Sequence, residues 1–324
     1  MKKRALPHSD IEVSRLGLGT STWGFSGSDD DSLAQLRSYA DAGGTLIETA
    51  NIYGQGESER IIGRALSREF RRDDFVIATK AGLVIGKPPT VDASKPRMLA
   101  ELENSLRNLQ VDHVDLWLVH IWDQHVPIEE TLSAIDTAVA AGKVRAAGLC
   151  NYSGWQTSQA ATIQRVRGAT PISAVEVEYS LLQRGIDREV RPAAKALGIG
   201  VLPWAPLGRG VLTGKYLHGV PDEKRSSGLY RWYVSQYAEN PELAGIVTEV
   251  VDCARELGAS PIEVSLAWVR DRPGVCAPLV GARTAQQLTA SLSSEALELP
   301  AEITERLDKI SALRLGYPER GLGR

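Results

Sequence analysis

Glu48 and Tyr53 stand five positions apart in residues 47–54, and together they could carry out proton chemistry. An apolar run leads into the acid, and an acidic helix start at Glu57 follows the tyrosine, so we expect Glu48 at a strand end and Tyr53 on the next loop. A tyrosine beside a carboxylate and a lysine can donate a proton, because a nearby cation lowers the tyrosine pKa from about 10. From this segment alone, a tyrosine that only packs at a loop edge is an equally good interpretation.

Size and composition exclude several classes of protein. The chain has 324 residues, 43% of them hydrophobic, which suits an α/β barrel with additions. A net charge of −3 gives no electrostatic case for a nucleic-acid or membrane partner. The three cysteines are widely spaced, which indicates a reducing compartment. No apolar signal region follows the basic start, so we expect a cytoplasmic protein.

Strand and helix patterns alternate regularly along the chain. After a hairpin or edge strand at residues 4–15, apolar strand patterns occupy residues 16–20, 45–48, 75–80, 114–120, 144–149, 174–179, 200–204 and 276–280. Helical patterns follow at residues 30–42, 57–67, 95–109, 128–141, 188–197, 241–257, 261–270 and 301–313, and also after Ser153 and after Thr284.

Eight strand–helix units predict a parallel sheet closed into a (β/α)8 barrel. We expect one domain over residues 1–324, with a long insert at residues 207–240 over the barrel mouth, extra C-terminal helices and a polar tail at residues 314–324.

Polar side chains end five of the predicted strands: Glu48, Lys80, His120, Asn151 and Glu176. In a barrel these ends meet at one mouth, where active sites lie. The chemistry predicted there is reduction or oxidation at a carbonyl, with the loop tyrosine as proton donor and the lysine depressing its pKa. The Glu48 carboxylate would hold the lysine, and the histidine would polarise the carbonyl oxygen. Since side chains cannot supply hydride, a nicotinamide is needed.

Each of these residues also has a plainer interpretation. Lys80 could be a structural ion-pair partner of Glu48, and His120 could be satisfied by the backbone. His120 could also bind a metal with Asp123 and His125, but this trio lacks a helical metal-binding spacing and a cysteine partner. We therefore predict no metal.

Two glycine-containing loops could bind phosphate. The chain lacks a Gly-x-Gly-x-x-Gly between its first strand and helix, which argues against a Rossmann domain. The loop at residues 208–215 fails the P-loop pattern, yet its glycines and Arg209 follow the seventh strand, where many barrels bind phosphate. The segment 281–284 leads into a helix whose amino terminus favours phosphate, and Arg283 could bind a 2′-phosphate or be a solvated surface arginine.

At this level of detail the chain resembles the aldo-keto reductases from Leu16 to about Leu292. The motifs that carry the resemblance are Glu48-Thr49-Ala50-Asn51-Ile52-Tyr53-Gly54, Thr79-Lys80, His120 in residues 118–123, residues 148–153 and residues 204–210. The long insert, Gly154-Trp155-Gln156 and the Gly-Ala-Arg segment at 281–283 are similar to the bacterial branch related to potassium-channel β subunits.

The resemblance implies NADPH bound in an extended form across the mouth. Gly19, Thr20 and Trp23 would line the nicotinamide side, while Cys150, Asn151 and Glu176 occupy the carboxamide-binding positions and Trp204 the ring-stacking position. The remaining matches are Leu207, Gly208 and Gly210 for the pyrophosphate and Gly281, Arg283, Gln287 and Ser291 for the adenosine phosphate.

Four positions depart from the family pattern. Glu48 replaces an aspartate and is one methylene longer, which could displace its pair with Lys80. Cys150 replaces a serine and Glu176 a glutamine, which changes the carboxamide hydrogen bonds, although an ionised glutamate still accepts from an NH₂ group. Trp204 replaces a tyrosine and keeps a flat stacking face.

These observations predict an NADPH-dependent reductase of an aldehyde or ketone, possessing Tyr53, Lys80, His120 and Glu48 as its catalytic residues. A cofactor-sensing regulatory subunit with vestigial catalysis is the second hypothesis, and a lyase or isomerase on the same barrel fits the phosphate signals less well. The expected partner is a small carbonyl compound, and oligomeric state is not readable. Aromatic residues expected to wall the substrate pocket are Trp23, Trp122, Tyr230 and Trp232, although the tyrosines and tryptophan of the insert could instead pack on one another.

Overall fold

Eight parallel strands form the ring in the computed structural model, which describes residues 1–25, 27–86, 89–221, 227–228, 230–314 and 316–317. The hydrogen-bonded order is β11-β10-β9-β8-β5-β4-β3-β12, with every neighbouring pair parallel. The ring strands are β3 (Gly17–Gly19), β4 (Leu46–Glu48), β5 (Val76–Ala81), β8 (Val114–Val119), β9 (Val144–Cys150), β10 (Ile172–Glu178), β11 (Gly200–Trp204) and β12 (Leu279–Val280).

The joint between β11 and β12 closes the ring. Val201 forms a parallel bridge with Val275, which lies just before β12. The Val201 N–H donates to the Gly274 carbonyl at 2.9 Å, and the Cys276 N–H donates back to Val201 at 2.9 Å. The predicted (β/α)8 fold is therefore confirmed.

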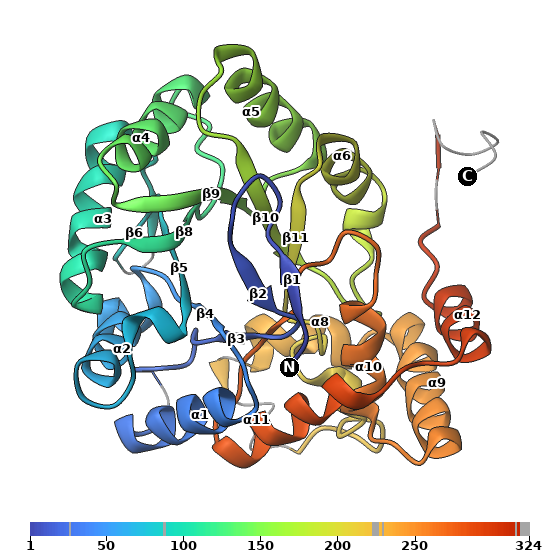
Figure 1. The fold of residues 1–324 in the computed structure, drawn as a ribbon. Coiled ribbons are helices and arrows are strands. Elements are labelled where there is room, and N and C mark those ends of the chain that lie inside the picture. The colour runs from blue at the N-terminus through green and yellow to red at the C-terminus, as the bar shows by residue number, and fades with distance from the viewer. Residues whose placement is uncertain (26, 87–88, 222–226, 229, 315, 318–324) are drawn as a thin grey trace.

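Helices surround the ring on its outer side (Figure 1). They are α1 (Asp29–Asp41), α2 (Glu57–Arg68), α3 (Lys95–Leu109), α4 (Ile128–Ala140), α5 (Gly154–Arg167), α6 (Val190–Leu197), α9 (Pro241–Leu257), α10 (Pro261–Arg270), α11 (Ala285–Leu292) and α12 (Ala301–Ile310). The short α8 (Ser235–Ala238) lies instead on the mouth side. Several begin where the sequence supplies a cap: the Ser153 hydroxyl accepts from the Gln156 N–H at the start of α5, and α5 ends at Gly168 in the left-handed conformation.

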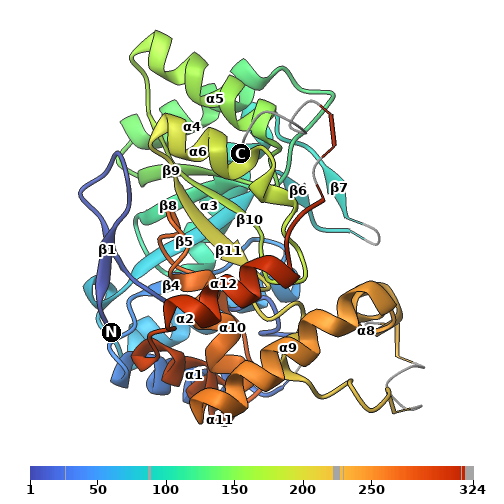
Figure 2. The same cartoon turned by 90° about the vertical axis from the view of Figure 1, so that its right-hand side faces the viewer.

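A hairpin of β1 (Lys3–Ala5) and β2 (Glu12–Ser14) covers the base of the barrel (Figure 1). Its apolar residues Leu6, Ile11 and Val13 are buried in one cluster with inward-facing strand residues such as Leu46 and Leu116. Figure 2 shows β1 on one side of the barrel and β6, β7 and α8 on the other. The hairpin therefore seals the end opposite the carboxyl ends of the strands.

The segments around the mouth are less regular. A second hairpin, β6 (Leu83–Val84) and β7 (Thr90–Val91), follows β5, in a segment for which the sequence analysis predicted no strand. After β11 the chain forms a short turn at Val211–Thr213, a π-helical turn at Tyr230–Val234, and α8. The division into one domain with an insert and a tail stays a prediction.

Close packing of α2 against α3 depends on Gly63. A Cβ atom there would lie 2.4 Å from the carbonyl oxygen of Asn108 and 2.9 Å from the carbonyl carbon of Leu109. Since backbone atoms cannot move aside locally, we expect Gly63→Ala to destabilise the fold by about 1–3 kcal/mol, measured by urea unfolding. The matched control is Gly245→Ala in α9, where nothing lies within 4 Å. That variant should gain about 1 kcal/mol from helix propensity, and equal effects at both sites would contradict the packing explanation.

Candidate active site

Glu48, Tyr53 and Lys80 meet at the carboxyl ends of β4 and β5. The Tyr53 hydroxyl donates to Glu48 Oε1 at 3.0 Å, and Lys80 Nζ donates to the Tyr53 hydroxyl at 3.1 Å. Lys80 also forms an ion pair with Glu48 Oε1 and donates to the Thr49 carbonyl at 3.2 Å. The longer Glu48 side chain thus keeps its contact with Lys80, and the predicted displacement of this pair is not seen.

A left-handed turn directs Tyr53 toward the mouth. The residues after it, Gly54, Gln55 and Gly56, have φ values of 56°, 58° and 85°. A Cβ at Gly54 would lie 2.7 Å from the Trp23 carbonyl oxygen, so only glycine lets the loop approach this closely. The Tyr53 N–H donates to Ala50 at 3.1 Å and fixes the start of the turn.

His120 stands directly after β8 and faces the tyrosine. Its ring centroid lies 6.1 Å from that of Tyr53, with the ring planes at 86°. The backbone N–H of His120 donates to the Ala81 carbonyl at 2.8 Å, and the backbone carbonyl of His120 accepts from Asn151 Nδ2 at 3.2 Å. These two bonds hold the backbone in place. Its Nδ1 is buried without a hydrogen-bond partner among the described residues. Burial, with the Lys80 charge as a second cause, lowers the histidine pKa well below 6.5, so the imidazole is neutral at neutral pH.

The buried neutral imidazole makes folding stability depend on acid pH. Because the folded-state pKa of His120 is depressed, its contribution is complete above the unfolded pKa of about 6.5 and is lost as the pH falls toward the folded value. We expect a loss of up to about 1.4 kcal/mol per pH unit in this window. Urea unfolding of the wild type and His120→Asn between pH 7.5 and 5.5 measures it, and parallel curves for the two proteins would contradict this assignment.

The predicted effect of Lys80 on Tyr53 is wrong. Burial is the largest cause and the Glu176 charge the next, and together they raise the Tyr53 pKa well above 10. The Lys80 ammonium, whose Nζ donates to the Tyr53 hydroxyl at 3.1 Å, does not outweigh these two causes. Tyr53 therefore stays protonated at neutral pH, which is the form that a proton donor requires.

Strands β9, β10 and β11 place a second set of polar side chains beside Glu48, Tyr53 and Lys80. Cys150 and Glu176 are register partners, and the Cys150 thiol donates to Glu176 Oε1 at 3.6 Å. Asn151, held at φ 57°, accepts from the Trp204 indole N–H at 3.0 Å and donates to Cys150 Sγ at 3.2 Å. Lys80 reaches Glu176 Oε1 at 3.2 Å from the other side. The residues predicted to bind the carboxamide thus form one connected network with the predicted catalytic residues.

Arg209 in the glycine-containing loop is engaged within the protein. Its guanidinium donates to both carboxylate oxygens of Glu178, at 3.0 and 2.8 Å, and lies 3.7 Å from the centroid of the Tyr233 ring. Tyr237 donates to the same carboxylate at 2.9 Å. This cluster ties the insert to the end of β10. In this structure the Arg209 side chain therefore holds the insert against β10, whereas the sequence analysis suggested that it binds phosphate.

Three of the predicted cofactor residues are not open at the mouth. Trp23 is 1% exposed and directs its indole N–H toward Gln35 of α1, and its place in the substrate pocket stays a prediction. The Thr20 hydroxyl donates to the Glu48 carbonyl at 2.8 Å and contacts Ser58. Ser291 is 4% exposed, and its hydroxyl donates to the Gln287 carbonyl one helical turn before it. Tight packing of α1, α2 and α11 on the ring, which sequence patterns do not resolve, explains these placements.

The other predicted cofactor residues occupy the rim. A Cβ at Gly19 would lie 3.3 Å from Glu48 Oε2, so a glycine leaves this carboxylate oxygen open. Leu207, Gly208 and Gly210 form the turn after β11. Gly281, Arg283 and Gln287 are exposed around the start of α11, where the Arg283 N–H donates to Gln287 Oε1 at 3.1 Å.

An aromatic group forms around Trp122, which stands two residues after His120 in the loop that follows β8. The Trp122 ring centroid is 5.4 Å from that of Tyr152 and 5.3 Å from that of Trp155, both in edge-to-face arrangements. Tyr152 and Trp155 were not predicted as site residues. Their positions just after the end of β9 could have indicated that they lie near the mouth. The side chains of Tyr230 and Trp232, also predicted for the pocket, lie outside the described part of the structure.

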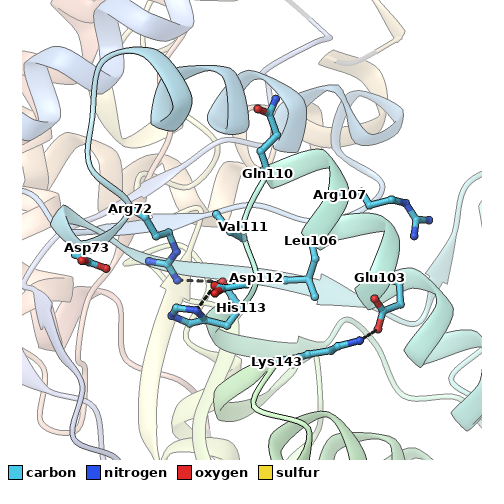
Figure 3. Close-up of a pocket in the computed structure, with 10 residues that line it drawn as sticks. All are labelled: Arg72, Asp73, Glu103, Leu106, Arg107, Gln110, Val111, Asp112, His113 and Lys143. Carbon is cyan, nitrogen blue, oxygen red and sulfur yellow. Dashed lines mark hydrogen bonds and ion pairs between the residues drawn. The ribbon is translucent and has the colours of Figure 1, made fainter.

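A groove of about 950 Å³ lies away from this chemistry (Figure 3). Its lining residues Arg72, His113 and Lys143 precede β5, β8 and β9, so it lies at the amino-terminal ends of the strands. Among its charged lining residues, Lys143 is paired with Glu103 and His113 with Asp112. It is therefore a surface groove at the end opposite the site.

Among the residues that the structure describes, neither a metal-ligand cluster nor a membrane-spanning helix is found. Within the described ranges no three histidine, cysteine or acidic side chains cluster as metal ligands. Asp123, considered as a ligand in the sequence, accepts from the backbone N–H groups of Ala93 and His125. No helix among the described residues is long and apolar enough to cross a membrane.

Comparison with known proteins agrees with this geometry. The profile of the Aldo/keto reductase family matches residues 15–312. The aldo-keto reductase YhdN of Bacillus subtilis is 34% identical over 90% of this chain and 87% of its own. Protein tas of Escherichia coli is 30% identical over 96% and 97% of the two chains. The glycerol dehydrogenase AKR11B4 from Gluconobacter oxydans superposes with a TM-score of 0.80 at 28% identity, covering 95% of this chain and 94% of its own. The chain therefore belongs to the aldo/keto reductase family of oxidoreductases.

Proposed function

We propose that this protein reduces an aldehyde or ketone to an alcohol with NADPH. One observation carries the proposal: the Tyr53 hydroxyl lies 3.1 Å from Lys80 Nζ and 3.0 Å from Glu48, facing His120 at the carboxyl ends of the strands. A protonated phenol beside a buried ammonium and a neutral imidazole is suited to protonating an oxygen that gains negative charge.

The side chains divide the reaction between them. When bound, a reduced nicotinamide supplies the hydride that protein groups cannot. Tyr53 gives its hydroxyl proton to the carbonyl oxygen, and the resulting phenolate is stabilised by the adjacent Lys80 ammonium. His120, neutral because it is buried, can donate a hydrogen bond to the same oxygen without adding a proton of its own.

The mouth fits a nicotinamide cofactor, which enzymes of this family use. Glu176 Oε2 is buried without a partner among the described residues and can accept from a carboxamide NH₂ group. The partly exposed Trp204 ring, fixed through Asn151, can stack on the nicotinamide. Arg283, exposed at the start of α11, is our candidate for contact with a 2′-phosphate, which favours NADPH over NADH.

The aromatic group around Trp122 limits the substrate class. Trp122 shares its loop with polar residues and packs edge-to-face with Trp155 at the start of α5, an arrangement that suits a sugar or an aromatic carbonyl. The name of the structural relative from Gluconobacter adds small polyols and their aldehydes as candidates.

The alternative is a cofactor sensor with weak catalysis. The observation in its favour is the pair of carboxylates on Lys80, which weakens the ability of the lysine to support a phenolate. In that case NADPH would bind and turn over very slowly.

A two-part experiment tests the proposal. NADPH and NADH are titrated against the protein by fluorescence, and NADPH consumption is then followed with glyceraldehyde, an aldose, an aromatic aldehyde and a quinone. We expect tighter binding of NADPH and turnover with at least one carbonyl. Binding without turnover would support the sensor, and no binding of either dinucleotide would refute both functions. Arg283→Ala should lower the affinity for NADPH and leave the affinity for NADH unchanged.

A further inference from the structure

Lys80 is shared between two buried carboxylates. It is 0% exposed, while Glu48 is 4% and Glu176 2% exposed. Its Nζ forms ion pairs with Glu48 Oε1 and, at 3.2 Å, with Glu176 Oε1. With both acids ionised, the three groups carry one net negative charge. His120 adds no compensating charge because its burial keeps it neutral.

The uncompensated charge resides on the Glu176 side of the cluster. Glu48 accepts from both Lys80 and Tyr53, whereas Glu176 has Lys80 and the weak Cys150 thiol donor on one oxygen only. The other oxygen, Oε2, is buried and accepts nothing from the described residues. A buried carboxylate oxygen is costly unless a donor or a positive charge comes near it. Glu176 therefore favours a ligand that brings positive charge.

The distances place this charge near any nicotinamide that can react. Two contacts, of 3.1 and 3.2 Å, connect the Tyr53 hydroxyl to Glu176 through Lys80. The carbonyl carbon must lie next to that hydroxyl, and the hydride donor about 3–3.5 Å from the carbon. The nicotinamide ring is thus within about 10 Å of Glu176. Its oxidised form is a cation and its reduced form is neutral, so the two forms interact differently with the carboxylate.

We propose that Glu176 makes the site select the oxidised, positively charged nicotinamide over the reduced one, which makes bound NADPH a stronger hydride donor and favours reduction of a carbonyl on the enzyme. The proposal rests on the function proposed above. Two unit charges about 10 Å apart in a protein interior change an affinity on the order of tenfold. The overall equilibrium of the reaction is unaffected, because only the balance between the two bound states shifts.

The test compares two variants at one position. Glu176→Gln removes the charge and keeps the shape, while Glu176→Asp keeps the charge. The dissociation constants of NADP⁺ and NADPH are measured separately for each protein by calorimetry and fluorescence. We expect Glu176→Gln to weaken the binding of NADP⁺ relative to that of NADPH about tenfold. Glu176→Asp should change the ratio of the two dissociation constants less than about threefold. Asp115→Asn, which removes a buried, ion-paired carboxylate from the opposite end of β8, should leave the ratio unchanged.

The wild type provides an independent reading if a variant fails to fold. It should bind NADP⁺ at least as tightly as NADPH, and a preference for NADPH of more than about tenfold would overturn the proposal. So would equal changes of the ratio in Glu176→Gln and Glu176→Asp, since these would indicate an effect of shape. If the wild type binds neither NADP⁺ nor NADPH, nor NAD⁺ nor NADH, the proposed function itself fails, and the charge proposal falls with it.

Discussion

Replacement of Tyr53 by phenylalanine is expected to lower kcat for carbonyl reduction by about 10²–10⁴-fold. The hydroxyl is the group within reach of both Lys80 and Glu48, and no proton can be donated to the carbonyl oxygen from a phenyl ring. The affinity for NADPH should stay within about twofold, because the ring and its packing are retained. Steady-state turnover and NADPH fluorescence titration measure the two effects separately.

A second tyrosine supplies the control for this experiment. Tyr39 is fully buried, and its hydroxyl donates to the carbonyl groups of Leu16 and Leu46 at 2.8 Å, away from the mouth. Tyr39→Phe should lower the free energy of unfolding by about 1 kcal/mol and leave kcat unchanged. Full turnover in the Tyr53 variant would remove this residue from the reaction.

Replacement of Lys80 by methionine is expected to cost about 3–5 kcal/mol of folding stability, besides abolishing turnover. The substitution leaves Glu48 and Glu176 buried without the cation that they share. Burial already raises the Glu176 pKa, and Lys80 is the main group that opposes this rise, so the pKa climbs further in the variant.

The sign of the pH dependence follows from this raised pKa. A carboxyl group whose folded pKa lies above its unfolded value of about 4.3 contributes stability that is complete below the unfolded value and is lost as the pH rises through the folded one. The defect of Lys80→Met should therefore be smallest in acid and grow toward neutral pH in urea unfolding. The double variant with Glu176→Gln should recover part of the loss, and an equal defect at every pH would contradict the role of the carboxylates.

The barrel and the strand ends could be predicted from the sequence because both follow from local patterns. The predicted strand at residues 114–120 is observed at Val114–Val119, and the helix predicted at residues 95–109 at Lys95–Leu109. Alternation of these units places polar strand ends at one mouth whatever the detailed packing is. The two-residue strands β6 and β7 were missed, since a loop rich in glycine and proline carries no periodic pattern.

The contact between Lys80 and Glu176 could not be predicted in the same way. Strands β5 and β10 are separated in the sheet by β8 and β9, so the two side chains meet only across the interior of the closed ring. Strand order alone does not say how far two inward side chains reach. The raised Tyr53 pKa depends first on burial and next on the Glu176 charge, neither of which strand patterns reveal, so its direction was also predicted wrongly.

The single bridge between Val201 and Val275 has a consequence for the movements of the barrel. This joint is made by two backbone hydrogen bonds, and the loops that would hold the two halves of the dinucleotide lie on either side of it, after β11 and after β12. Amide protons at this joint should therefore exchange with deuterated solvent sooner than those of β8 and β9, whose pairing covers most of both strands. A dinucleotide bound to both loops would connect them across this joint and slow the exchange of these amide protons.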